Sequence, residues 1–126
     1  MSETERNKTV IRKIEEAWTK DDVASLDQYF APDFHPHSTA PGTPATLESA
    51  KTAHAMSRRA FPDRTKEMLD IIAEGDRVFI RTRVQGTNTG GASWFGAPPN
   101  GKPFDIESWA IYRLKDGKVV EWQLTS

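Results

Sequence analysis

The feature that most limits what this chain can fold into is a change in hydrophobic period close to Arg64. Before this residue, apolar side chains recur at the spacing of helices, and after it apolar and polar residues alternate with the period of strands. Helices followed by consecutive strands are typical of an α+β domain, in which helices pack on one face of an antiparallel or mixed sheet. Because 126 residues leave no room for a second packed core, we expect one domain over residues 1–126.

Two helices are predicted in the first quarter of the chain. The first runs from about Glu3 to Thr19, and a second, shorter helix follows Asp21 or Asp22 as its N-cap and ends at Pro32. The apolar stripe of the first helix consists of Val10, Ile11, Ile14, Ala17 and Trp18. The inner face of the second helix consists of Val23, Leu26, Tyr29 and Phe30.

A third helix is predicted after the Pro-rich segment. It begins after Thr46, whose hydroxyl suits an N-cap, and ends at the Phe61-Pro62-Asp63 run. Its predicted apolar face consists of Leu47, Ala50, Ala53, Met56, Ala60 and Phe61. His54 lies beside this face and is expected to be a boundary residue.

The second half of the chain is predicted to form a meander of strands. The Glu74-Gly75-Asp76 run indicates one turn, and Asp116-Gly117 indicates a tight hairpin turn before a return strand from Val119 to Leu124. The residues expected on the inner face are Val78, Ile80, Thr82, Val84, Phe104, Ile106, Ser108, Ala110 and Tyr112. A strongly curved sheet leaves a gap beneath the helices, which is a natural site for a small molecule.

Composition excludes several functions. With 17 Lys+Arg and 18 Asp+Glu, the net charge of -1 gives no general attraction to nucleic acid or to an acidic membrane, and the Arg58-Arg59 pair is too small to change this. Cysteine is absent, which excludes disulfides, thiolate nucleophiles and Cys-ligated metal centres. The N-terminus is polar and no apolar run is long enough to span a membrane. We expect a cytoplasmic protein, although the lack of cysteine fits a secreted one nearly as well.

Five stretches of the sequence together carry a family signal. They are Tyr29-Phe30-Ala31-Pro32-Asp33-Phe34, Phe61-Pro62-Asp63, Ile72-Ala73-Glu74-Gly75-Asp76-Arg77-Val78, Gly86-Thr87-Asn88-Thr89-Gly90 and the run from Tyr112 to Glu121. In this order they resemble the SnoaL-like, polyketide-cyclase-like branch of the nuclear transport factor 2-like superfamily. The resemblance implies a cone-shaped, curved sheet with about three N-terminal helices on its concave face, a deep pocket and a dimer. Members include cyclases, hydroxylases, epoxide hydrolases and isomerases as well as proteins without catalysis, so the fold leaves the activity open.

The resemblance also shows what this chain lacks. Cyclases of the family usually carry a His three positions before the Arg that matches Arg113, and an acid, the general acid/base, after a Trp on the last strand. In this chain those two positions are Ala110 and Leu124, and neither side chain can transfer a proton. The resemblance therefore favours the fold and argues against the usual cyclase mechanism.

Two residues are candidates for catalysis. His37 matches a position where relatives often have a pocket-facing His, and its ordinary pKa suits a base near neutral pH; the alternative is a loop or strand histidine bonded to backbone or water. A carboxylate beside an aromatic wall has a raised pKa and can act as acid or base, which makes Glu107 a candidate. Its phase favours the outer face, where cross-strand ion pairs and a partner subunit are expected. His35 and His37 point to opposite sides of an extended segment and have no acidic ligands nearby, so we expect no metal. We also expect no cofactor.

Aromatic and flexible apolar side chains are the candidate ligand contacts, with core packing as the alternative. They are Tyr29, Met56, Phe61, Trp94, Tyr112 and Trp122. Trp94 lies in a Gly-rich loop that would cap the pocket or join a dimer contact. We therefore expect a protein that binds a hydrophobic or aromatic small molecule, either a cofactor-independent cyclase, isomerase or hydratase or a non-catalytic binding or interaction domain. A homodimer is expected through the outer sheet face around Trp109 and Ile111.

Overall fold

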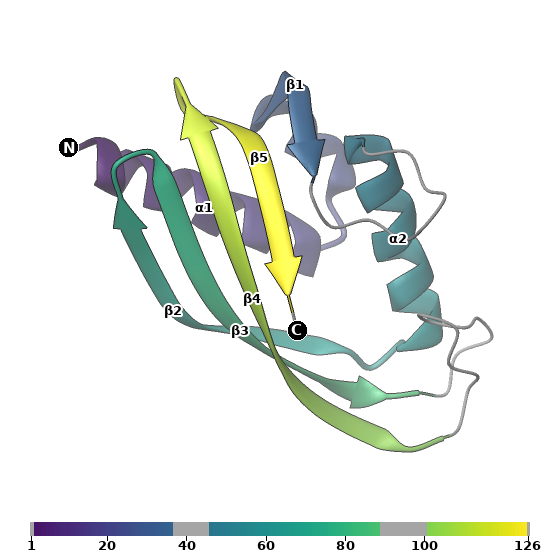
Figure 1. Ribbon diagram of the computed structural model, residues 1–126. Coiled ribbons are helices and arrows are strands. Elements are labelled where there is room, and N and C mark those ends of the chain that lie inside the picture. The colour runs from purple at the N-terminus through teal and green to yellow at the C-terminus, as the bar shows by residue number, and fades with distance from the viewer. Residues whose placement is uncertain (1, 37–45, 89–100, 126) are drawn as a thin grey trace.

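The computed structural model describes residues 2–36, 46–88 and 101–125. Its elements in chain order are α1 (Glu3–Thr19), the 3₁₀ helix η1 (Val23–Gln28), β1 (Phe30–Pro36), α2 (Leu47–Ala60), β2 (Thr65–Glu74), β3 (Arg77–Thr87), β4 (Pro103–Lys115) and β5 (Lys118–Thr125). The strands form one mixed sheet in the order β1-β5-β4-β3-β2. The sheet bends strongly along β3 and β4, with α1 crossing one of its faces and α2 standing at one side (Figure 1). The predicted α+β architecture is confirmed.

The first helix has the predicted bounds. Ser2 is its N-cap, and the Ser2 hydroxyl accepts a hydrogen bond from the backbone N–H of Glu5. Its predicted stripe is largely buried, because Ile11, Ile14 and Trp18 pack into the core against the sheet. Neither α1 nor α2 is long and apolar enough to cross a membrane.

The second predicted helix is shorter than expected. It is a 3₁₀ helix that ends at Gln28, and the chain is already in β1 at Phe30. Pro32 therefore lies inside a strand and does not end a helix. It is tolerated because β1 is an edge strand, parallel to β5, where one side of the ladder needs no N–H donor.

The third helix begins after Thr46 as predicted. Its predicted inner face is confirmed at Leu47, Ala50, Ala60 and Phe61, and it is wrong at Ala53 and Met56. The Thr46 hydroxyl accepts a hydrogen bond from the N–H of Ser49 at 3.1 Å. Ala53 and Met56 are exposed, whereas Ser57 is buried and the His54 ring is in contact with Trp18. Polar residues occupy this face because they find polar partners there, a feature that hydrophobic periodicity does not register.

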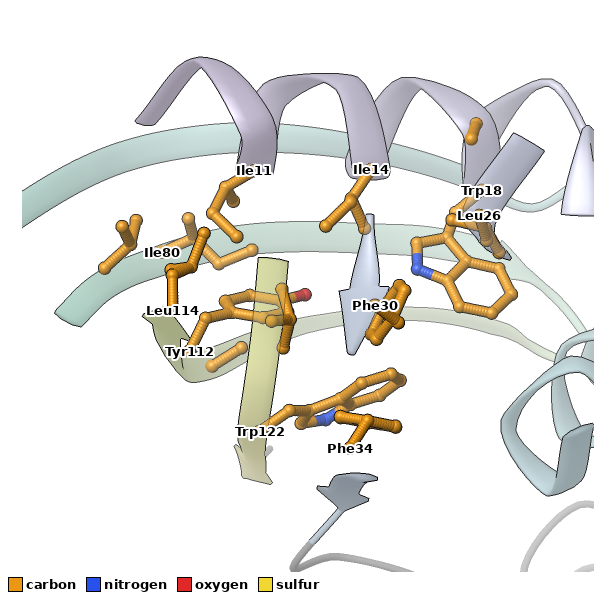
Figure 2. Packing of buried hydrophobic residues seen from close by; sticks show 14 residues of the cluster. Ile11, Ile14, Trp18, Leu26, Phe30, Phe34, Ile80, Tyr112, Leu114 and Trp122 are labelled. Carbon is orange, nitrogen blue, oxygen red and sulfur yellow. The ribbon is translucent and has the colours of Figure 1, made fainter. Parts of the chain in front are cut away.

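The predicted turns and strand phase are confirmed. Asp116 and Gly117 have φ values of 53° and 77°, the left-handed pair that a tight hairpin turn requires. Val78, Ile80, Ala110 and Tyr112 are buried on the concave face, as predicted. The side chains of this core converge beneath α1 (Figure 2). The search for a ligand-binding site therefore begins on the concave face of the sheet.

Candidate functional site

An aromatic cluster lines the concave face, and Trp122 lies at its centre (Figure 2). Its ring centroid is 5.7 Å from that of Phe34, 6.0 Å from Tyr112, 6.2 Å from Phe30 and 6.3 Å from Trp18. These five residues come from α1, β1, β4 and β5, so the cluster forms only when the sheet and helices close on each other. Tilted and edge-on ring pairs at such distances are the favoured arrangements of aromatic side chains.

Trp122 carries a polar atom that the cluster does not satisfy. The residue is 7% exposed, and its Nε1–H donates to no acceptor among the residues that the structure describes. A buried donor without a partner costs about 1 to 3 kcal/mol. An acceptor atom within hydrogen-bond distance of this N–H would remove that cost.

A buried carboxylate joins α1 to the sheet beside this cluster. Glu15 is 8% exposed; its Oε1 accepts a hydrogen bond from the Tyr112 hydroxyl at 3.1 Å, and its Oε2 lies 2.8 Å from Nζ of Lys66. Burial and the Glu15 charge both raise the pKa of Tyr112 well above its ordinary value. Tyr112 is therefore a neutral hydrogen-bond donor whose proton is already committed to Glu15.

A second polar group, which we call the His54 cluster, consists of Asp21, His54, Ser57, Arg58 and Arg64. His54 Nε2 lies 2.6 Å from Asp21 Oδ1, and His54 Nδ1 lies 3.4 Å from Nη2 of Arg64. Arg64 Nη1 donates to the Ser57 hydroxyl at 2.6 Å, and Nε of Arg58 lies 3.3 Å from Asp21. The His54 ring lies 4.9 Å from that of Trp18, so this polar group borders the aromatic cluster.

The hydrogen bonds of His54 fit a neutral imidazole. In this tautomer, assigned from the bonding pattern, Nε2–H donates to Asp21 and Nδ1 accepts from Arg64. Burial lowers the pKa of His54, and the charges of Arg64 and Arg58 act in the same direction. The hydrogen bond and charge of Asp21 act the other way, but they do not outweigh burial.

The predicted ligand contacts separate into two groups. Tyr112 and Trp122 lie together on the concave face, and the half-buried Tyr29 packs against the same core. Phe61 is buried, but it packs on Phe104 with ring centroids 4.8 Å apart, away from the aromatic cluster. Met56 is 36% exposed on the outer side of α2, which contradicts its predicted place in the interior.

The remaining predicted residues do not join this site. His37 and Trp94 lie outside the described residues, so their roles stay predictions. Glu107 lies on the convex face, with Oε1 2.8 Å from Nη1 of Arg81, in the cross-strand ion pair that was its alternative interpretation. Glu107 as a catalytic residue stays a prediction that this position does not favour.

The two positions where cyclases usually carry their acid/base pair are neighbours on two adjacent strands. Ala110 of β4 and Leu124 of β5 are register partners, and Ala110 is 5% exposed on the concave side. Register partners lie side by side on the same face of the sheet, and neither of these two side chains can transfer a proton. Within residues 2–36, 46–88 and 101–125, no group of three or more His, Cys, Asp or Glu side chains is arranged to hold a metal ion.

Hydrophobic patterning did not identify the residues of the two polar groups. His54 was assigned to a boundary, and Glu15 and Arg64 received no role. A usable signal exists for Glu15, which lies four residues after Ile11 and next to Ile14 in the buried stripe of α1. A charged residue at such a position needs a partner across the core.

The curved mixed sheet with N-terminal helices defines an α+β scaffold, and its similarity to known proteins identifies the family. The family model for SnoaL-like polyketide cyclases matches residues 8–125, and the chain belongs to this family. Among curated proteins no match is found.

Solved structures give the same assignment. IdmH of Streptomyces antibioticus, a proposed polyketide cyclase, is 30% identical with a TM-score of 0.78, and the match covers 94% of this chain and 90% of IdmH. AclR of Streptomyces galilaeus, a proposed hydroxylase, is 26% identical with a TM-score of 0.79, and the match covers 97% of this chain and 89% of AclR. TsrD of Streptomyces laurentii has a TM-score of 0.83 at 18% identity over 99% of this chain and 90% of TsrD, a likeness of fold alone.

Proposed function

We propose that this chain binds a hydrophobic or aromatic, polyketide-like small molecule on the concave side of its sheet. The observation that carries the proposal is the Trp122 indole, which is buried among four aromatic rings with its N–H unsatisfied among the described residues. A flat aromatic ligand with a carbonyl or hydroxyl oxygen offers both the ring contact and the missing acceptor. The names of IdmH and AclR, which refer to polyketide and hydroxylase chemistry, agree with this class of ligand.

The catalytic form of the proposal is a cofactor-independent cyclisation, isomerisation or hydration. Ala110 and Leu124 replace the usual cyclase pair, so a proton transfer would depend on another group, and His37 is the first candidate. Non-catalytic binding is the alternative, and the same two substitutions favour it. Loss of turnover with retained binding in His37→Ala supports the catalytic form, whereas unchanged turnover excludes His37.

The binding test is a titration with hydroxylated anthraquinones and naphthoquinones, followed by tryptophan fluorescence in the wild type and by calorimetry in the variants. Trp122→Phe keeps an aromatic ring but removes the N–H, and we expect it to weaken binding about tenfold. Trp109→Phe is the matched control, because Trp109 is 48% exposed on the convex face, and it should leave the affinity unchanged. Absence of binding by every ligand, or equal losses in both variants, would contradict the proposal.

We also propose that the convex sheet face forms a homodimer. It exposes Ile72, Trp109 and Ile111, and next to them Arg81 pairs with Asp70 and Glu107, and Arg83 with Asp105. Apolar side chains surrounded by fixed charges suit a self-complementary two-fold contact. Light scattering should give twice the 14.2 kDa chain mass, and Trp109→Glu should give the single chain mass. A wild-type monomer at high concentration would refute the dimer.

A further inference from the structure

The charges inside the His54 cluster and its neighbourhood do not balance. Three cations, Arg58, Arg64 and Lys66, face two carboxylates, Glu15 and Asp21. Lys66 pairs with Glu15, and Arg58 lies against Asp21. No carboxylate of the described residues lies within ion-pair distance of Arg64, so the surplus positive charge rests on its guanidinium.

The Arg64 guanidinium also has unused hydrogen-bonding capacity. A guanidinium has five N–H donors, and within the described part of the chain Arg64 uses one toward Ser57 and one toward His54. Three donors therefore remain for another partner. Arg64 is half-buried, and burial together with the charge of Arg58 lowers the pKa of its guanidinium, against the weaker opposing effect of Asp21 and Glu15.

The residues around Arg64 hold it in one orientation. Ser57 lies on the buried side of α2, and His54, fixed by Asp21 through its other nitrogen, offers only an acceptor to the guanidinium. Asp21 stands at the C-terminal end of α1 with φ 58°, and the backbone bonds Asp21 N–H to Trp18 O and Asp22 N–H to Ala17 O define a Schellman end. Glycine is the usual residue there, and Asp21 instead supplies the carboxylate that orients His54.

A continuous path of contacts joins Arg64 to the aromatic cluster. Arg64 Nη2 lies 3.4 Å from His54, the His54 ring lies 4.9 Å from Trp18, and the Trp18 ring lies 6.3 Å from Trp122. A ligand that reaches the exposed part of Trp18, 7% of that residue, is separated from the guanidinium by His54. A carboxylate fits such a partner because its two oxygens accept hydrogen bonds from neighbouring guanidinium N–H groups.

We propose that Arg64, positioned by His54, Asp21 and Ser57, binds the carboxylate of a ligand whose aromatic body contacts Trp18 and Trp122. This inference rests on the proposed binding function and adds the chemical class of the ligand, an aromatic carboxylate. Arg64 touches the ligand, whereas His54 and Asp21 act as positioning residues.

The test compares 2-naphthoate with its neutral isostere 2-naphthamide by calorimetry at pH 7 and low salt. The wild type should bind the naphthoate at least about tenfold more tightly, since a charge-assisted hydrogen bond is worth roughly this ratio. Arg64→Gln should abolish the preference, so that the two probes bind with equal affinity. Arg59→Gln removes the same charge from an exposed site five residues earlier and should keep the preference in full.

Each outcome separates this inference from the proposed function. Binding of both probes with equal affinity, or a preference that persists in Arg64→Gln, overturns the carboxylate site while the small-molecule pocket stands. No binding of either probe overturns the pocket and the site together. If circular dichroism shows that Arg64→Gln is unfolded, Arg64→Lys replaces it. The Lys ammonium keeps the positive charge but lacks the pair of parallel N–H donors of a guanidinium, so the preference for naphthoate should fall at least about threefold. An unchanged preference overturns the proposal.

Discussion

His54 is the residue whose ionisation is most informative about this protein. Its pKa lies below the ordinary value of 6.5 in the folded chain, chiefly because the ring is buried. The charged groups that face it are Asp21 just after α1, Arg58 from α2 and Arg64 just before β2. Nuclear magnetic resonance should therefore give a titration midpoint below that of an exposed histidine. In Asp21→Asn the midpoint should fall further, because the carboxylate is the group that raises it; a rise would contradict the arrangement.

The same shift sets the pH dependence of stability. As the pH falls, the unfolded chain takes up a proton on His54 before the folded chain does. The stability that the neutral imidazole provides is thus fully present above about pH 6.5 and is lost as the pH falls toward the folded pKa. Urea unfolding from about pH 8 to about pH 5 should show a larger loss in the wild type than in His54→Gln. Equal losses in the two proteins would exclude His54 as the cause.

Between elements, the Glu15 carboxylate is the main polar connection of α1 to the sheet. Tyr112→Phe removes the hydroxyl that donates to it and leaves a buried oxygen with one donor fewer. We expect a loss of about 1.5 to 3 kcal/mol in the free energy of unfolding, measured with urea. Tyr29→Phe is the matched control, since the Tyr29 hydroxyl bonds to none of the described residues, and should cost about 0.5 kcal/mol or less. Equal losses would show that Glu15 finds another donor.

The elements also show how far sequence reasoning reaches. The change of period at Arg64, the Ser2 and Thr46 caps and the Asp116-Gly117 turn all depend on neighbours in the chain, and their predictions are confirmed. The inner face of α2 depends on partners far away in sequence, because His54 is buried against Trp18 and Asp21. A prediction from hydrophobic periodicity treats such a histidine as a polar surface residue, and it therefore places Met56 on the buried face of α2 instead of His54.

For the candidate site, the reach of the sequence is shorter still. Tyr112 and Trp122 were predicted from strand phase, which is local, and they meet on the concave face. Glu15 and Arg64 belong to pairs that form only after folding, with partners such as Lys66 and Ser57 on other elements. Side-chain pairs between distant elements leave no periodic pattern in the sequence, so a single sequence does not reveal which residues will pair.

At the scale of the whole molecule, the sheet separates two surfaces with different demands. The convex face carries exposed apolar side chains and cross-strand ion pairs, and the concave face carries the aromatic cluster. Ala110 and Leu124 are register partners on β4 and β5, and neither is the His or the acid that cyclases of the family usually carry there. The space on the concave side at residues 110 and 124 decides whether a His and an Asp can be introduced there.

That space can be measured through stability. Ala110 is 5% exposed and packs in the core cluster with Ile80 and Tyr112, so Ala110→His should cost about 1 to 3 kcal/mol by overpacking. Leu124 is 39% exposed, and Leu124→Asp should cost about 1 kcal/mol or less. Urea unfolding of the two single variants tests this order. If Ala110→His is as stable as the wild type, the concave side has room for an imidazole beside residue 124. The double variant then becomes the direct test of whether this scaffold supports proton transfer by a His and Asp pair.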